Sequence, residues 1–291
     1  MSALPTSSSA MRRGAAGARR AGIQSVTRRV ARLYFDISYR LLAGSVAGRR
    51  LLALPAAGGR PVHGYFTSED RDTLLAVLDP APGDRLLDLG SGLGGIAIEL
   101  HRRSGAEILG VDISRQAVSS ATARARRERV DASVGFRAGD LARPPRTGAA
   151  DAYAIDSLMF VPDLADALRG IGEALGPGGR LFATLLVVGP GGGPRLQQAV
   201  RDAGADLERL DDVTPALAER SRARAGAAAL LKRDGTTTFR GRLAMRLVSA
   251  EEGLVQARIK SGRVSRWRFV VRYGTLLERD AAHIRAIEEA A

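Results

Sequence analysis

Short apolar runs and longer amphipathic segments alternate along the middle of the chain, from residue 85 to residue 188. The apolar runs predict strands, and the segments with apolar residues at every third or fourth position predict helices. Strands and helices that alternate with short connections predict an α/β fold, in which helices cover a doubly wound, mostly parallel sheet. The predicted strands are Arg85–Leu89, Glu107–Val111, Val134–Arg137, Ala150–Ile155 and Arg180–Val188, and the predicted helices are Gly94–Arg103, Ser114–Arg129 and 163–175.

Less regular segments flank this core on both sides. Before it, apolar residues at helical spacing predict an amphipathic helix over 23–42, and Ser68 is expected to cap a helix that runs to Leu78. After it, the glycines and prolines of 189–194 (GPGGGP) predict a flexible break. The later elements are expected to be helices at 195–203, 214–232 and 240–257, strands at 206–210 and Val264–Tyr273, the last of these antiparallel, and a polar helix at Leu276–Ala290.

These patterns divide the chain into one α/β domain with additions at both ends. Residues 1–20 are rich in Ser, Ala, Gly and Arg and are expected to form a disordered basic arm. We expect a helical cap over 21–60, the sheet core over 61–190, a lid with the closing strands of the same domain over 191–275, and a terminal helix over 276–291.

A glycine-rich turn directly follows the first predicted strand, in the run LLDLGSGLGG (86–95). Glycines permit a tight turn and let the backbone approach a ligand closely, and the next helix presents unpaired N–H groups to it. The spacing also satisfies the GxGxxG pattern of dinucleotide sites. Asp88, two residues before the first glycine, is poorly placed beside a pyrophosphate but suits a cofactor with an amino group and a sulfonium.

Three further acids follow successive predicted strands: Asp112, Asp140 and Asp156. Because parallel strands end at one edge of a sheet, these carboxylates and Asp88 are expected to converge on one rim, where ligands of open α/β sheets bind. Asp112 is placed to accept the hydroxyls of a ribose, and Asp140 is placed near an adenine amino group. A single Asp after a strand is usually a cap or turn residue, but four in order around one glycine turn indicate a site.

The net charge of +13 is concentrated at the start of the chain, where residues 1–60 hold eleven arginines and one acid. A basic arm can contact nucleic acid or anionic lipid, and a solvated arm is the simpler interpretation. The chain has no cysteine, which excludes disulfides, thiolate zinc sites and cysteine nucleophiles. It has no apolar run long enough for a transmembrane helix, so we expect a cytoplasmic protein.

Four motifs resemble those of class I S-adenosylmethionine (SAM)-dependent methyltransferases: LLDLGSGLGG (86–95), GVDIS (110–114), AGDL (138–141) and LGPGGRLFAT (175–184). The most similar branch contains ubiquinone/menaquinone, sterol and natural-product methyltransferases. The resemblance implies a Rossmann-like fold with an antiparallel closing strand, helical N-terminal and lid additions, and SAM as the cofactor. SGRVSRWRFVVRY (261–273) resembles the closing strand.

The resemblance also implies roles for individual residues. The methionine part of SAM would be held by Asp88 and the turn from Gly90 to Gly94, and the ribose by Asp112. Asp156 is expected to face the transferred methyl group. The complete expected cofactor set is Tyr65, Asp88, Gly90, Ser91, Gly92, Gly94, Asp112, Ile113, Asp140 and Leu141.

Methyl transfer from a sulfonium is an in-line displacement that requires alignment and exclusion of water. A general base helps when the acceptor must lose a proton, and His63 is the first candidate because HGYF (63–66) resembles a segment that covers the cofactor. A structural role for His63 is equally open. No histidine–carboxylate spacing suggests a metal site. Trp267 and Phe269 alternate with arginines and are expected to belong to the core.

Three other functions stay open at this point. The basic arm favours a nucleic-acid or protein methyltransferase, although DSLMF (156–160) lacks the Pro-Pro-aromatic motif that clamps a flipped base and suits an apolar pocket. A non-catalytic SAM-binding scaffold and an NAD-dependent oxidoreductase are the others. We expect transfer to a small molecule, as in secondary metabolism, with O-, N- and C-methylation all possible and nucleic acid not a partner.

Overall fold

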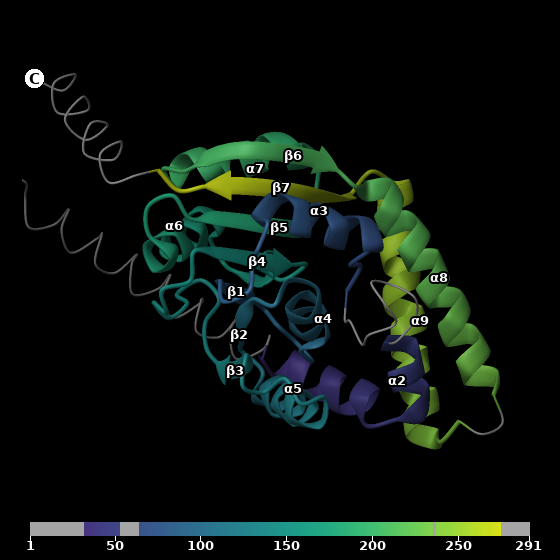
Figure 1. The fold of residues 1–291 in the computed structure, drawn as a ribbon. Coiled ribbons are helices and arrows are strands. Elements are labelled where there is room, and N and C mark those ends of the chain that lie inside the picture. The colour runs from purple at the N-terminus through teal and green to yellow at the C-terminus, as the bar shows by residue number, and fades with distance from the viewer. Residues whose placement is uncertain (1–31, 53–63, 235–236, 275–291) are drawn as a thin grey trace, which may run out of the picture.

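The computed structural model describes residues 32–52, 64–234 and 237–274, and these form a seven-stranded sheet with helices on both faces (Figure 1). The strand order is β3-β2-β1-β4-β5-β7-β6, and β7 runs antiparallel to both of its neighbours. The predicted α/β fold with an antiparallel closing strand is therefore confirmed. The strands are β1 Arg85–Leu89, β2 Glu107–Asp112, β3 Val134–Ala138, β4 Asp151–Ile155, β5 Arg180–Val188, β6 Asp206–Asp212 and β7 Val264–Arg272.

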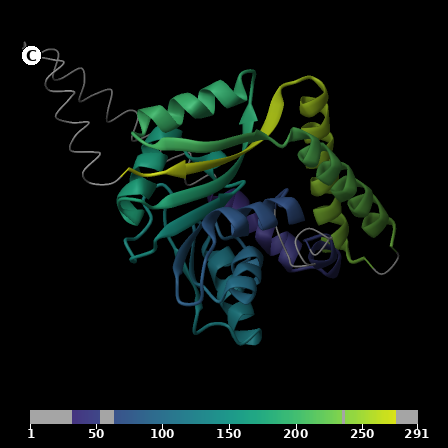
Figure 2. The same ribbon diagram turned by 45° about the horizontal axis from the view of Figure 1, so that its top comes forward.

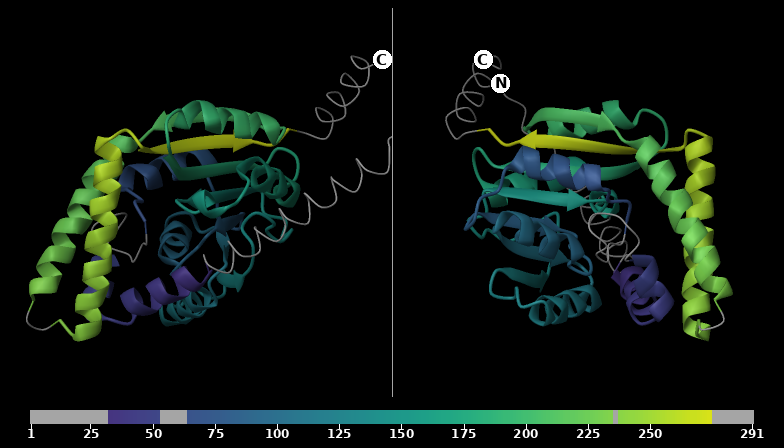
Figure 3. Two further views of the ribbon diagram at one scale, coloured as in Figure 1. Left: turned by 180° about the vertical axis from the view of Figure 1, so that it is seen from behind. Right: turned by 45° about the vertical axis from the view of Figure 1, so that its right-hand side comes forward.

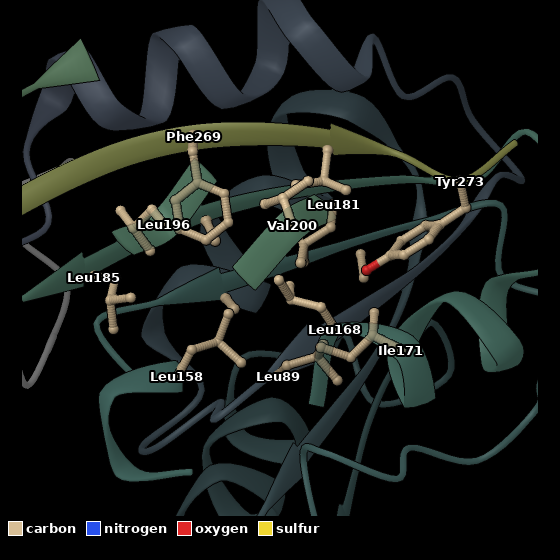
Figure 4. Packing of buried hydrophobic residues seen from close by; sticks show 14 of the residues in the cluster. Leu89, Leu158, Leu168, Ile171, Leu181, Leu185, Leu196, Val200, Phe269 and Tyr273 are labelled. Atoms are coloured by element: carbon tan, nitrogen blue, oxygen red, sulfur yellow. The ribbon is translucent and has the colours of Figure 1, made fainter. Parts of the chain in front are cut away.

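The two faces of the sheet carry separate apolar cores. One core lies under α3 (Ser68–Leu78), α4 (Gly95–Ser104) and α5 (Arg115–Arg127). The other lies under α6 (Leu164–Leu175) and α7 (Gly192–Asp202), with a short 3-10 turn at Leu158–Phe160 (Figures 2 and 4). Both faces of the parallel strands β1, β4 and β5 are buried, as this sheet type requires. Figure 4 shows the second core, in which side chains of β7, α6 and α7 meet.

Helical additions cover one end of the sheet. Residues 32–43 are helical and lead to α2 (Val46–Leu52), while α8 (Thr214–Arg233) and α9 (Phe239–Lys260) form a hairpin inserted between β6 and β7 (Figures 1 and 3). A third apolar cluster joins them, and its members are Tyr39, Leu42, Ala47, Leu51, Leu52, Leu93, Ala117, Ala228, Ala244, Met245 and Val248. Because Leu93 and Ala117 follow β1 and β2, this helical cap stands over the edge at which the parallel strands end.

The GPGGGP segment (189–194) is not the flexible break that its composition predicts, because α7 begins inside it at Gly192. A Cβ on Gly192 would lie 2.3 Å from Nε1 of Trp267, and one on Gly193 would lie 2.8 Å from Cη2 of the same ring. These glycines therefore allow α7 to pack tightly on β7. A second correction concerns α3, whose N-cap is Thr67 and not Ser68, since the Thr67 side chain accepts a hydrogen bond from the backbone N–H of Asp70.

Trp267 and Phe269 pack in the second core, as expected, but the arginines that alternate with them, Arg266 and Arg268, were not predicted to be buried. Arg266 is fully buried and Arg268 is 4 % exposed, both on the opposite face of β7 and beneath α3. Their charges are compensated there by the acids described below.

Some expectations lie outside the described residues: the disordered arm at 1–20, the first part of the helix at 23–42, His63, and the terminal helix at 276–291. Across the three described ranges, no helix is long and apolar enough to cross a membrane.

Candidate functional site

A cavity of about 1090 Å³ lies where β1, β2 and β4 end, beneath the helical cap. It is open to solvent on one side, and this volume includes part of the opening. The lining residues within the described chain are Tyr34, Phe35, Tyr39, Gly64, Tyr65, Gly90, Asp112, Ile113, Asp140, Leu141, Ile155, Asp156, Ser157, Met159, Phe160, Val161, Pro162, Leu186, Arg224 and Glu251.

The glycine turn after β1 adopts conformations that only glycine reaches without strain. Gly90 and Gly94 have φ values of 86° and 74°, in the left-handed region. A Cβ on Gly90 would lie 2.4 Å from Cβ of Ser157, and a Cβ on Gly94 would lie 2.5 Å from Cζ of Phe136. The turn thus brings its backbone close to the end of β4 and leaves Gly90 on the cavity wall.

Asp112 fastens this turn to the end of β2. One of its carboxylate oxygens accepts a hydrogen bond from the backbone N–H of Gly92 at 2.8 Å, and the other accepts one from the N–H of Ser114 at 2.8 Å. Burial raises the pKa of Asp112, and these two backbone donors oppose the rise. Each oxygen retains acceptor capacity toward the cavity, which makes Asp112 suitable for binding a pair of hydroxyls.

Asp88 lies beneath the turn and does not line the cavity. It is 2 % exposed, and its Oδ2 has no hydrogen-bond partner. Burial raises the pKa of Asp88 to about 8, with an opposing effect from the Tyr153 hydroxyl and a further rise from the charge of Asp112. A buried carboxyl that lacks a positive partner is suited to a ligand that brings a cation to the turn.

Asp156 follows β4 and lines the cavity with its acceptor atoms already engaged. Its Oδ1 accepts hydrogen bonds from Nε of Arg266 at 2.8 Å and from the hydroxyl of Thr184 at 3.0 Å, and its Oδ2 accepts one from the backbone N–H of Tyr65 at 2.9 Å. Arg266 also donates to Asp70 of α3 at 2.9 Å. The ion pair therefore ties β4, β7 and α3 together and holds the backbone of Tyr65 at the cavity wall.

Tyr65 in turn contacts the helical hairpin. Its hydroxyl donates to Glu252 of α9 at 3.2 Å, and Glu252 also accepts from Nε of Arg224 of α8 at 2.5 Å. The Arg224 guanidinium lies 5.7 Å from the centre of the Tyr65 ring. Burial raises the pKa of Tyr65, and the charge of Glu252 adds to this, so the phenol stays protonated and donates.

The structure brings seven of the predicted site residues to the cavity: Tyr65, Gly90, Asp112, Ile113, Asp140, Leu141 and Asp156. Ser91, Gly92, Gly94 and Asp88 support this wall from behind and do not line the cavity. Sequence reasoning missed Tyr34, Phe35 and Tyr39 from the cap and Arg224 and Glu251 from the hairpin. These residues carry no local motif, and only the helical packing brings them to the sheet edge.

The chemistry of the two sides of the cavity differs. The sheet edge supplies carboxylates and backbone amides, which suit a polar ligand with hydroxyl and amino groups. The cap, the 158–160 turn and β5 supply mainly aromatic and aliphatic side chains, including Phe35, Phe160 and Leu186. Phe35 and Phe160 meet edge to face at 4.8 Å, which closes the apolar side.

Residues 80–217 match a family described as a methyltransferase domain. The chain is 33 % identical over 156 residues to 27-O-demethylrifamycin SV methyltransferase of Amycolatopsis mediterranei, across 49 % of this chain and 57 % of that protein. It is 35 % identical over 121 residues to methyltransferase GfsG of Streptomyces halstedii, across 40 % of this chain and 43 % of that protein. The chain thus spans about half the length of these curated relatives.

Solved structures share the fold. The [4+2]-cyclase SpnF has a TM-score of 0.65 at 22 % identity, covering 81 % of this chain and 94 % of that one. Phosphoethanolamine N-methyltransferase 2 of Haemonchus contortus has a TM-score of 0.64 at 18 % identity, covering 82 % and 57 %. At these identities the likeness concerns the fold, and one fold supports different chemistries.

Proposed function

We propose that this chain, whose residues 80–217 match a methyltransferase domain, is a class I methyltransferase that transfers a methyl group from SAM to a small-molecule acceptor. The observation that carries the proposal is the cavity itself, which has a polar sheet edge on one side and an apolar wall on the other. The first side suits the cofactor and the second suits the acceptor.

The residues at the sheet edge fit SAM. Asp112 would bind the ribose hydroxyls, Ile113 and Leu141 would flank the adenine, and Asp140 would meet its amino group. The buried Asp88 has an unpartnered oxygen, which fits the positive charge that the methionine part carries. The glycine turn permits close approach of the same part of the ligand.

Bound SAM supplies an electrophilic methyl group on a sulfonium, so the protein mainly aligns the acceptor and excludes water. The helical cap and the aromatic residues of the apolar wall exclude water. Asp156 accepts hydrogen bonds from Arg266, Thr184 and Tyr65, which supports a role in positioning Tyr65 more than a role in proton transfer. We retain His63 as the proposed general base, because its neighbour Gly64 lines the cavity.

A small acceptor is supported by the apolar wall of the cavity and by the relatives. Several of them are named for small-molecule acceptors, including the rifamycin enzyme and a ubiquinone/menaquinone C-methyltransferase of Dinoroseobacter shibae. Another is named as a 23S rRNA methyltransferase of Azoarcus, at 34 % identity over 103 residues. The acceptor class therefore requires a direct test.

The test is incubation of the purified protein with SAM labelled in its methyl group, together with either an extract of small metabolites or total RNA. We expect label in an extractable small molecule and none in RNA. Label in RNA would overturn the small-molecule proposal. Absence of transfer to both, with SAM bound, would support the non-catalytic scaffold. Tight binding of NAD in place of SAM would support the oxidoreductase.

A further inference from the structure

A buried arginine lines the acceptor side of the cavity. Arg224 projects from α8, is 2 % exposed, and is the only basic side chain among the described residues that line the cavity. Its Nε donates to Glu252, and its guanidinium lies over the Tyr65 ring. Glu252 of α9 and the ring of Tyr65 therefore fix the orientation of this guanidinium.

The Nη1 atom of Arg224 is buried and has no hydrogen-bond partner. A buried donor without a partner costs about 1–3 kcal/mol, and more when the group is charged, so native proteins rarely retain one without a ligand or water to satisfy it. Glu252 does not satisfy it in this structure, because its oxygens accept from Arg224 Nε and from the Tyr65 hydroxyl and neither forms a hydrogen bond with Nη1.

The surroundings of Arg224 specify what would satisfy this donor. Phe35, Met159, Phe160 and Leu186 give the acceptor side an apolar wall, so the ligand body must be apolar there. Glu251 also lines the cavity, and burial raises its pKa, which reduces the negative charge that an oxygen anion would meet. A guanidinium in such surroundings binds carboxylate-like oxygens most strongly.

We infer that Arg224 anchors an acidic oxygen, such as a carboxylate, phenolate or enolate, on an otherwise apolar acceptor. This inference rests on the proposed function, since it assigns the acceptor side of the same cavity. Arg224 would then determine which acceptors bind, while the carboxylates of the sheet edge hold the cofactor.

The test compares two probes that differ only in this group, 2-naphthoate and 2-naphthamide, by calorimetry on the full chain saturated with S-adenosylhomocysteine. We expect naphthoate to bind at least about tenfold more tightly, as a charge-assisted hydrogen bond provides. Arg224→Met should abolish this preference. Arg222→Met is the matched control, because Arg222 is exposed on the same helix, and it should retain the preference.

Arg224→Met leaves Glu252 without its cation, so a second variant, Arg224→Met with Glu252→Gln, guards against misfolding. It too should bind S-adenosylhomocysteine and lose the preference. Equal binding of the two probes to the wild type, or binding of neither, would overturn the anchor. Failure of the wild type to bind S-adenosylhomocysteine would instead contradict the proposed function, so the two failures are distinguishable.

Discussion

Asp112 is the carboxylate at the sheet edge that joins the glycine turn to the start of α5. It accepts backbone hydrogen bonds from Gly92 in the glycine turn and from Ser114 at the start of α5, and it faces the cavity between them. Its loss would therefore remove a ligand contact and also release the turn that forms part of the site.

We predict that Asp112→Ala weakens SAM binding at least about tenfold, because one or two charge-assisted hydrogen bonds are lost. Calorimetry on the folded variant measures this. Asp131→Ala is the control, since Asp131 is exposed after α5, and it should bind normally. Unchanged affinity in a folded Asp112 variant would refute the assignment of this carboxylate.

Asp88 is a carboxyl group whose burial opposes ionisation. The pKa of Asp88 is about 8 in the folded protein and about 4 in the unfolded chain. At a pH between these two values, Asp88 is protonated in the folded protein and ionised in the unfolded chain. The folded state then binds more protons than the unfolded state, so this group's contribution to stability falls as the pH rises from about 4 to about 8.

Asp88→Asn removes this dependence, because the amide never ionises. We compare the melting temperatures of the variant and the wild type without ligand. We predict that the difference, variant minus wild type, increases by at least about 3 °C when the pH is raised from 5.5 to 7.5. SAM should bind the variant more weakly, since the carboxylate is lost. Asp131→Asn should show no such pH-dependent gain, and a constant difference for Asp88→Asn would contradict the raised pKa.

A variant of His63 separates an effect on the rate of methyl transfer from an effect on SAM affinity. If it is the general base, His63→Ala slows turnover about a hundredfold or more while SAM affinity changes little. Single-turnover rates and calorimetry on one preparation give both quantities. An unchanged rate would remove it as the base.

The sequence predicted the site residues that follow strands, because a strand's end fixes where the next side chain lies. Asp112, Asp140 and Asp156 reach one cavity for this reason. It could not predict that Asp88 sits behind the turn, nor that Asp156 pairs with Arg266, since both facts depend on which groups bury them. Arg224 gives no local signal, because it is one of several arginines on α8.

At the scale of elements, α3 and β7 are joined by buried charges. Asp70 of α3 accepts from Arg266 and lies 3.5 Å from Arg268, while Asp211 of β6 and Glu69 also pair with Arg268. The alternation in β7 predicted a strand correctly, yet the face that carries the arginines is buried as well as the apolar face. Acidic side chains of other elements compensate the charges of these arginines, and those elements are remote from β7 in the sequence.

We predict that Arg266→Met lowers the free energy of unfolding by about 3–5 kcal/mol, because Asp156 is left buried without its cation and Asp70 keeps only the 3.5 Å contact with Arg268. Denaturant titration measures this. Arg272→Met at the exposed end of the same strand should leave stability nearly unchanged. A triple variant, Arg266→Met with Asp70→Asn and Asp156→Asn, should recover much of the loss, and a loss that persists would contradict the charge argument.

The boundaries of the elements show where local patterns are sufficient. β5 spans Arg180–Val188 as predicted, because an apolar run between glycines leaves little alternative. The predicted start of α7 was wrong, because Gly192 and Gly193 allow close packing on Trp267 and do not form a flexible break. A glycine's purpose depends on its neighbour in space, which one sequence does not reveal.

At the scale of the whole molecule, the helical cap completes the site. The helix over 32–43 reaches the sheet edge through Asp36, which accepts a hydrogen bond from the Ser114 hydroxyl at 2.5 Å. The sequence predicted the helices of the cap but not their position, because their mutual packing depends on contacts across about two hundred residues. The two-sided character of the cavity emerges only from this assembly.

In the proposed function, the sheet edge binds the adenosyl part of SAM and the apolar wall binds the acceptor. A crystal structure with S-adenosylhomocysteine tests this arrangement most directly. We predict the ribose hydroxyls at hydrogen-bond distance from Asp112 and the adenine between Ile113 and Leu141. An adenosyl group bound against Arg224 and Phe160, or elsewhere on the molecule, would contradict it.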